Sequence, residues 1–190
     1  IENNPFTNLE NSLGVVYVVR DPRNVLISAA NHNQTTHEKT LEKIVHGSVI
    51  GKNDGESTLV YTGNWASNYK SWKSFEAASK YLLIKYEDLI FDKEKTFLKI
   101  LEFIYKLSKK SFVLDNAKFK NVLNTTDFGN MQKMENETGF HESLVDNKTG
   151  KKTKFFYLGP KNDWKKLLDK VIQKKIEEVF KKEMTELGYL

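Results

Sequence analysis

An arginine and a serine near the start of the chain carry side-chain groups that can bind a phosphate. Arg20 follows five apolar residues, Val15–Val19, which predict a short strand buried on both faces. Asp21 can cap the next helix and Pro22 fits its first turn, so the pattern predicts strand, tight turn and helix. Ser28 comes two turns into that helix. A phosphate bound there would meet a guanidinium, a hydroxyl and a helix N-terminus.

The segment Gly14–Asn31 resembles the 3′-phosphate-binding segment of the sulfotransferases that use 3′-phosphoadenosine 5′-phosphosulfate (PAPS). In that family an arginine ends a strand and a serine follows eight positions later, on the next helix. Arg20 and Ser28 match both types and the spacing, so the resemblance implies that they bind the 3′-phosphate of the cofactor. The residues alone leave an alternative, in which Arg20 pairs with a surface carboxylate.

A second match follows the apolar run Tyr81–Lys85, which predicts another strand. The family has a Tyr-Glu-Asp sequence at this place, and its tyrosine contacts the adenine. The resemblance therefore implies that Tyr86 contacts adenine. The residues alone suggest a commoner role for Glu87 and Asp88, namely capping the turn that follows.

A third match lies around Phe128. The family has Thr-Ser-Phe with a methionine three positions further on, and Thr126, Phe128 and Met131 match this pattern. The resemblance implies that Thr126 and Phe128 border the adenine, whereas Phe128 on its own would be taken for a core residue. Asp127 stands where serine is usual in the family, which puts one polar contact in question.

A fourth segment resembles the family's Arg-Lys-Gly-x-x-Gly-Asp-Trp-Lys loop, which closes over the 3′-phosphate. The matching residues are Gly159, Asp163, Trp164 and Lys165. The resemblance implies that the backbone amides of Leu158 and Gly159 bind the phosphate, because a backbone donor does not depend on the side chain.

The same segment departs from the family at three positions. Tyr157 and Leu158 replace the Arg-Lys pair, and Asn162 replaces the second glycine. Loss of the arginine charge would weaken a phosphate site unless Lys161 or Lys154 compensates.

The fold class expected is α/β, a three-layer P-loop-like sulfotransferase fold with the two runs as parallel strands side by side. Further helices are predicted over Glu38–Ile50, Asn64–Lys80, Lys93–Leu107, Ser111–Leu123 and Leu167–Leu190. Turns are expected at Gly51–Gly55 and up to Gly63, where the chain could form a flap, and a long exposed loop is expected over Glu135–Lys154. The aromatic residues of the second of these helices recur on one face and are expected in the core.

Composition narrows the function classes. The chain has no cysteine, which excludes disulfides and Cys-ligated metal and is compatible with a cytoplasmic protein. No apolar run is long enough to span a bilayer. The net charge is +5, but the lysines alternate with glutamates, as over Lys174–Lys182, which favours a solvated helix face over a nucleic-acid groove.

No metal-ligand spacing occurs, and the resemblance implies no metal. None of the histidines, His32, His37, His46 and His141, has the family's catalytic context.

Two parts of the family's active site have no counterpart in the sequence. The family binds the 5′-phosphosulfate with a loop such as Pro-Lys-Ser-Gly-Thr-Thr, and its catalytic histidine also precedes the arginine-bearing strand. The 190 residues begin at Ile1 and contain neither. We therefore expect residues 1–190 to be the C-terminal portion of a single sulfotransferase domain, which carries no catalytic base and is inactive on its own.

The function expected is sulfuryl transfer from PAPS to a hydroxyl or amine of a small-molecule or carbohydrate acceptor, leaving adenosine 3′,5′-bisphosphate. Two alternatives remain: another P-loop-type nucleotide enzyme, such as a kinase, and a nucleotide-binding module without catalysis. The upstream gene sequence discriminates among the three functions. A Pro-Lys-Ser-Gly-Thr loop followed by Lys-Thr-His supports the sulfotransferase, Gly-Lys-Ser/Thr supports another P-loop-type enzyme, and neither loop supports the binding module. Neither the acceptor nor the oligomeric state is predicted.

Overall fold

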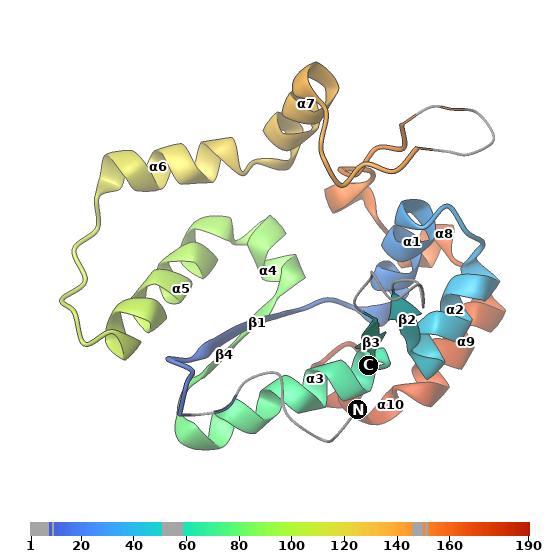
Figure 1. The fold of residues 1–190 in the computed structure, drawn as a ribbon, viewed down its shortest axis with the longest axis horizontal. Coiled ribbons are helices and arrows are strands. Elements are labelled where there is room, and N and C mark those ends of the chain that lie inside the picture. The colour runs from blue at the N-terminus through green and yellow to red at the C-terminus, as the bar shows by residue number, and fades with distance from the viewer. Residues whose placement is uncertain (1–7, 9, 51–58, 146–149, 151) are drawn as a thin grey trace. The chain divides into compact units, whose positions relative to one another are not determined.

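The computed structural model describes the chain except residues 1–7, 9, 51–58, 146–149 and 151. The described residues divide into two compact units (Figure 1). Unit 1 combines the residues up to Arg20 with Tyr69–Leu123, and unit 2 combines Asp21–Asn68 with Asn124–Leu190. The two units are described separately below.

Unit 1 is built on a pair of parallel strands. Strand β1 (Val15–Val19) pairs with β4 (Tyr81–Lys85) in a register that sets Val15 opposite Tyr81 and Val19 opposite Lys85. Helix α4 (Tyr86–Phe91) starts directly after β4, and α5 (Lys93–Leu107) packs beside the strands (Figure 1). The predicted parallel pair is therefore confirmed.

Strand β1 is less buried than its apolar sequence predicts. Val15 and Val19 are buried, but 47% of Val18 is exposed. Side chains alternate between the two faces of a strand, so Val18 faces away from the side that buries Val15 and Val19. The expectation of burial on both faces is wrong at Val18, since the described residues leave it uncovered.

The helix predicted over Asn64–Lys80 has two parts. Helix α3 (Trp65–Lys73) continues as the 3₁₀ helix η1 (Ser74–Ala78), which ends at Ser79 in a left-handed conformation with φ 55°. The predicted aromatic stripe lies inward as expected: Tyr69 and Phe75 are buried in unit 1, and Trp65 packs on Phe180 in unit 2.

Helix α6 (Asn116–Thr125) begins five residues later than predicted. Asp115 determines the start, because its carboxylate accepts a hydrogen bond from the backbone N–H of Lys118 at 3.0 Å. A capping carboxylate fixes the first turn of a helix. The prediction over Ser111–Leu123 relied on apolar spacing and overlooked this cap.

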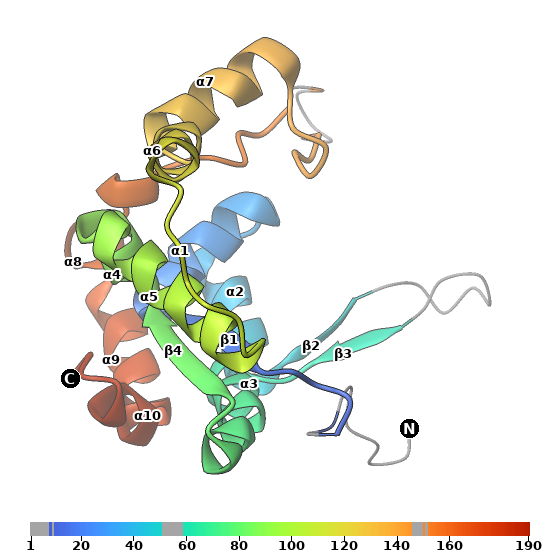
Figure 2. The same ribbon diagram turned by 90° about the vertical axis from the view of Figure 1, so that its left-hand side faces the viewer.

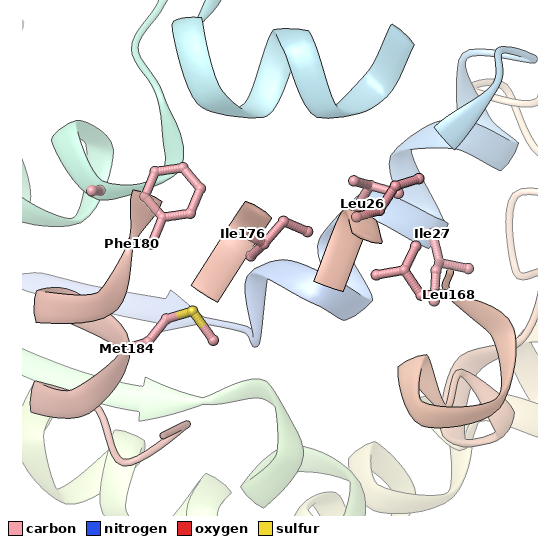
Figure 3. Close-up of a cluster of buried hydrophobic side chains, with 8 residues drawn as sticks. Leu26, Ile27, Leu168, Ile176, Phe180 and Met184 are labelled. Atoms are coloured by element: carbon pink, nitrogen blue, oxygen red, sulfur yellow. The ribbon is translucent and has the colours of Figure 1, made fainter. Parts of the chain in front are cut away.

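Unit 2 begins with helix α1 (Pro22–His32), as predicted. The carboxylate of Asp21 caps it by accepting from the N–H of Arg23 at 2.9 Å, and Pro22 occupies the first turn. The apolar face of α1 packs against the C-terminal helices (Figure 3). The core of unit 2 consists of Leu26, Ile27, Ala66, Leu168, Ile172, Ile176, Phe180 and Met184.

The C-terminal segment forms three helices instead of the single helix predicted over Leu167–Leu190. They are α8 (Trp164–Leu167), α9 (Lys170–Val179) and α10 (Lys181–Glu186). Leu168 is extended, and Asp169 starts α9 by accepting from the N–H of Val171 at 2.7 Å. Asp is a preferred cap residue, so it interrupts a helix that apolar spacing alone would continue. The predicted apolar stripe is correspondingly incomplete, because 75% of Val171 is exposed.

A short hairpin replaces part of another predicted helix. Helix α2 (His37–His46) ends at Gly47, whose φ of 80° and close approach to the carbonyl of Thr62 suit only glycine. Strand β2 (Ser48–Ile50) then pairs antiparallel with β3 (Val60–Thr62) (Figure 2). The helix predicted over Glu38–Ile50 is therefore wrong beyond His46, and the turn predicted at Gly51–Gly55 lies outside the described residues.

The loop predicted over Glu135–Lys154 starts too early. Helix α7 (Phe128–Thr138) extends into it, and an isolated antiparallel bridge joins Val145 to Lys152. Glu135 is buried, which is unusual for a residue assigned to an exposed loop.

Candidate functional site

Arg20 and Tyr86 lie together in unit 1. Each follows the carboxyl end of one of the two parallel strands, and the guanidinium carbon of Arg20 lies 4.2 Å from the centroid of the Tyr86 ring. Open α/β sheets bind ligands at this edge. A guanidinium that stacks on a ring keeps its N–H groups in the plane, where they can donate to a planar or tetrahedral anion. The two residues thus present a cation and an aromatic face side by side.

Ser28 is connected to the 158–163 loop in unit 2 through Asn162. The side-chain amide of Asn162 donates to Ser28 Oγ and to the carbonyl of Asn24, each at 3.0 Å. A second link joins the same segments, because the N–H of Trp164 donates to Asn24 Oδ1 at 3.1 Å. The loop is therefore fastened to α1 on the side that carries Ser28.

Gly159 and Phe128 are in close contact in unit 2. Gly159 begins the 3₁₀ helix η2 (Gly159–Lys161) with φ 50°, and a β-carbon at this position would lie 2.3 Å from the Phe128 ring. Phe128 is half-buried at the start of α7. Leu158 packs against the core of unit 2 and lines a cavity of about 440 Å³ with Ile27.

Thr126 is exposed in the turn before α7, and Asp127 caps that helix by accepting from the N–H of Gly129 at 2.9 Å. Serine and aspartate are both preferred caps. Asp127 can therefore start this helix as well as the serine usual in the family, and its presence does not disturb the backbone between Thr126 and Phe128.

The structure groups the expected residues within each unit. Unit 1 brings Arg20 to Tyr86, and unit 2 brings Phe128 to Gly159 and connects Ser28 to the loop. Thr126 directly precedes the residue that caps α7 and lies two positions before Phe128. At the two positions where the family has Arg-Lys, Tyr157 is 48% exposed and Leu158 is partly buried.

Arg23 is a buried arginine that sequence reasoning missed. Only 3% of it is exposed, and its guanidinium binds the carboxylates of Asp21 and Glu177 and the carbonyl of Tyr189. Its central carbon lies 3.7 Å from the centroid of the Trp164 ring. Burial would lower the pKa of Arg23, but its hydrogen bonds to the two carboxylates and their negative charges outweigh burial and raise it. The only sequence signal was an aspartate two positions before it.

Glu135 is a second buried charge that sequence reasoning missed. Its carboxylate accepts from Ser143 Oγ at 2.7 Å and from the N–H groups of Phe155 and Phe156 at 2.6 and 3.0 Å. Burial tends to raise the pKa of Glu135, but these hydrogen bonds, with the charge of Lys154, outweigh it and lower the pKa. Glu135 thereby holds the segment before the 158–163 loop onto α7.

Two negative findings apply to the described residues. Between residues 8 and 190, with the gaps given above, no three His, Cys, Asp or Glu side chains are grouped so as to hold a metal ion. Within the same described ranges, no helix combines the length and the apolar character required to cross a membrane. His32 is half-buried, and its ring packs edge-on against Phe155.

The parallel strands β1 and β4 and the helices that follow each of them define an α/β protein. Residues 3–188 match the family model described as "Sulfotransferase domain". The chain therefore belongs to the sulfotransferase family, and the resemblance drawn from the motifs is confirmed.

Curated relatives support the assignment. The chain is 26% identical over 175 residues to a 3-beta-hydroxysteroid sulfotransferase of Cavia porcellus, which covers 92% of the chain and 56% of the relative. It is 24% identical to human sulfotransferase 2A1, covering 91% of the chain and 57% of the relative. The chain thus spans little more than half the length of these relatives.

Solved structures share the fold. Mouse sulfotransferase SULT7A1 complexed with PAP superimposes with a TM-score of 0.62 at 19% identity, over 90% of the chain and 58% of the mouse protein. A retinol dehydratase in complex with androsterone and the inactive cofactor PAP gives the same TM-score and identity, over 90% of the chain and 47% of that protein. The predicted fold class, α/β with a parallel sheet as in P-loop-like sulfotransferases, is confirmed.

Proposed function

We propose that the protein containing this chain transfers a sulfuryl group from PAPS to a hydroxyl or amine of an acceptor. Membership of the sulfotransferase family supports this proposal. So do the two structures of the same fold that were solved with PAP, adenosine 3′,5′-bisphosphate, which is the nucleotide left after the transfer. Since the chain spans only part of its relatives, the activity is proposed for the whole protein.

The stacking of Arg20 on Tyr86 is the observation that carries the proposal furthest. These two residues belong to separate motifs, 66 positions apart, and the sequence suggested one for the phosphate and the other for the base of a single nucleotide. The side chains meet at the carboxyl edge of a parallel strand pair, 4.2 Å apart. That edge is where an open α/β sheet binds a nucleotide.

We propose the following nucleotide contacts for residues of the two units, which are considered one unit at a time. In unit 1, Arg20 binds the 3′-phosphate and Tyr86 contacts the adenine. In unit 2, the Ser28 hydroxyl and the amides of Leu158 and Gly159 bind the 3′-phosphate, while Thr126 and Phe128 border the adenine. The motifs support this assignment, and we propose that both units are parts of one sulfotransferase domain.

The residues present fit a bound nucleotide. The absent β-carbon of Gly159 lets the loop backbone lie close to the Phe128 ring, so that a backbone amide and an aromatic ring are neighbours. Unit 1 offers a guanidinium, and unit 2 offers a hydroxyl and backbone amides; each of these groups suits a phosphate. Lys161 and Lys154, the two lysines that would compensate for the lost Arg-Lys charges, are both exposed.

The cofactor would supply the sulfuryl group, and this chain's residues would hold the nucleotide that leaves. A fixed cation and fixed amides at the 3′-phosphate orient the nucleotide without reorganising during the reaction. The catalytic histidine and the 5′-phosphosulfate loop of the family do not occur in the 190 residues. We therefore expect residues 1–190 alone not to catalyse the transfer.

The acceptor is proposed to be a small molecule with a hydroxyl or amine. The relatives are named as hydroxysteroid and amine sulfotransferases, which supports this class over a carbohydrate. A cytoplasmic location is proposed as well, and the cysteine-free sequence supports it.

Titration and transfer assays with the full-length protein test the proposal. The protein should bind adenosine 3′,5′-bisphosphate more tightly than adenosine 5′-phosphate, and it should transfer ³⁵S from labelled PAPS to a hydroxysteroid or a primary amine. Preference for ATP over both nucleotides, with phosphoryl transfer, would instead support a kinase. Binding of adenosine 3′,5′-bisphosphate with no transfer to any acceptor class would support a nucleotide-binding module.

A further inference from the structure

One face of helix α7 lies along the segment that leads into the 158–163 loop. Phe128, Gln132 and Glu135 occupy positions i, i+4 and i+7 of this helix, so they share a face. The ring of Phe128 packs edge-on against that of Phe156, with the centroids 6.4 Å apart. The carboxylate of Glu135 accepts from the backbone N–H groups of Phe155 and Phe156. All five residues belong to unit 2.

Gln132 binds the same segment through its carbonyl groups. The side-chain amide nitrogen of Gln132 lies 2.8 Å from the carbonyl oxygen of Phe156 and 3.1 Å from that of Tyr157. A carbonyl oxygen can only accept, so the nitrogen is the donor in both bonds. At Phe156, therefore, the N–H donates to Glu135 and the carbonyl accepts from Gln132, and one helix satisfies both backbone groups.

These side chains replace the hydrogen bonds of regular secondary structure. Residues 153–157 lie outside every helix and strand of the described structure. Backbone groups that are removed from water need partners, which a helix or a sheet would otherwise supply. Glu135 is buried and also accepts from Ser143 Oγ, so three donors fix the position of its carboxylate.

The segment held by α7 ends next to the two amides proposed to bind the 3′-phosphate. Leu158 directly follows Tyr157, and the backbone of Gly159 approaches the Phe128 ring so closely that a β-carbon would lie 2.3 Å from it. The face of α7 therefore contacts the chain on both sides of Leu158. A backbone donor cannot turn toward a phosphate as a long side chain can, so its use depends on the position of the chain.

We infer that Gln132 and Glu135 are positioning residues for the nucleotide. They fix the backbone before Leu158, and thereby the distance between the phosphate-binding amides and the Phe128 ring. The inference rests on the proposed function, which assigns those amides to the 3′-phosphate and Phe128 to the adenine. Precise placement matters more in this chain than in the family, because Tyr157 and Leu158 replace the charged Arg-Lys pair and leave more of the binding to the backbone.

Gln132→Met in the full-length protein tests the inference. Methionine is also unbranched and of similar length but has no N–H group, so the variant removes both hydrogen bonds and keeps the packing. Calorimetric titration measures the affinity for adenosine 3′,5′-bisphosphate and for adenosine 5′-phosphate. The variant should bind the bisphosphate about tenfold more weakly, the size expected for one hydrogen bond to a charged group. It should bind the monophosphate as before, because only the bisphosphate has a 3′-phosphate for the loop amides.

Glu135→Gln is a second variant of the same contact. A glutamine side chain offers one acceptor oxygen in place of two, and its NH₂ group opposes an N–H that the carboxylate accepted. Its loss of affinity for the bisphosphate should be at least as large as that of Gln132→Met, again without a loss for the monophosphate.

Gln173→Met is the matched control. Gln173 also donates its side-chain amide to two backbone carbonyls of unit 2, those of Leu168 at 2.6 Å and Trp164 at 3.5 Å, but both of these residues follow the 158–163 loop. The same substitution should therefore leave both affinities unchanged.

Three results would overturn the inference while leaving the proposed function intact. The first is an unchanged affinity for the bisphosphate in Gln132→Met. The second is an equal loss for the two nucleotides, which indicates a general loosening of unit 2 and not a displaced phosphate loop. The third is a loss in Gln173→Met as large as that in Gln132→Met. A wild-type protein with no preference between the nucleotides would overturn the proposed function, and the inference with it.

Discussion

Gly159 and Phe128 are in contact at a distance that excludes a side chain on Gly159. A β-carbon would lie 2.3 to 2.5 Å from three atoms of the Phe128 ring, well inside van der Waals contact. Gly159 also has φ 50°, a conformation that other residues seldom adopt. The close approach of loop and ring thus depends on one glycine.

Gly159→Ala should therefore destabilise the protein and displace Phe128. Left-handed strain costs about 1–2 kcal/mol and overpacking about 1–3 kcal/mol, so the free energy of unfolding should fall by about 2–5 kcal/mol in urea denaturation. Gly150→Ala is the control, because Gly150 has φ 67° but nothing lies within 4 Å of its would-be β-carbon. It should show the strain alone. Phe128→Ala added to Gly159→Ala should recover part of the loss, and no recovery would contradict the proposed steric cause.

Replacement of Arg23 should cost more stability than replacement of any surface cation. Arg23→Ala removes the guanidinium that pairs with the buried Asp21 carboxylate, and breaking a buried ion pair in this way costs about 3–5 kcal/mol. Arg23→Lys should recover little, because lysine cannot reproduce the two-carboxylate fork or the stack on Trp164. Lys166→Ala is the control, since the Lys166–Asp163 pair is exposed and should contribute about 0–1 kcal/mol. Thermal and urea unfolding measure the loss of stability in Arg23→Ala and in Lys166→Ala. Equal losses would contradict the prediction that the buried arginine contributes more.

Because of Glu135, the stability of the protein should fall as the pH is lowered into the acidic range. Its pKa is lowered in the folded protein, so its ionised form contributes stability above its unfolded pKa, and this is lost as the pH falls through the folded pKa. Glu135→Gln should reduce stability at pH 7, because an NH₂ group then faces a backbone N–H that the carboxylate accepted. The difference between wild type and variant should shrink as the pH is lowered from 7 to about 3. A difference that stays constant over this range would contradict the prediction.

Local sequence signals predicted the strand–turn–helix around Arg20 correctly. The apolar run, the Asp21 cap and Pro22 act within a few residues, so each can be read without knowing the rest of the fold. Gly188 is a similar local signal, since it follows the last helix with φ 69°, a conformation that favours glycine. Predictions failed where a polar residue inside an apolar pattern began a new helix, as at Asp169 and Asp115.

Long-range contacts could not be predicted from the sequence. Arg23 is buried because Glu177 and Tyr189, more than 150 positions away, close around it. In the sequence, Asn162 is only a departure from a motif. Its hydrogen-bond partners, Asn24 and Ser28, lie more than 130 positions away along the chain. Nothing in the local sequence around Arg23 or Asn162 indicates these distant partners. The contact between Arg20 and Tyr86 is different, because each residue follows a predicted strand and parallel strands bring their carboxyl ends to the same edge of a sheet.

Removal of the Arg20 guanidinium tests the proposed phosphate contact most directly. Bonds to charged groups contribute roughly 1.5–3 kcal/mol, so Arg20→Ala should weaken binding of adenosine 3′,5′-bisphosphate by about tenfold to a few hundredfold in the full-length protein. Adenosine 5′-phosphate, which lacks the 3′-phosphate, should bind almost as before. Arg20→Lys should not restore the affinity, because lysine cannot make two parallel bonds to a phosphate.

Variants of Tyr86 give the matching control, because the adenine is common to both nucleotides. Tyr86→Ala removes the ring under the guanidinium and should weaken both nucleotides, whereas Tyr86→Phe keeps the ring and the 4.2 Å stack and should weaken neither by much. Calorimetric titration of each variant with each nucleotide separates the two roles. If Arg20→Ala affected the nucleotides equally, as Tyr86→Ala is expected to do, Arg20 would support the position of Tyr86 and would not bind the 3′-phosphate.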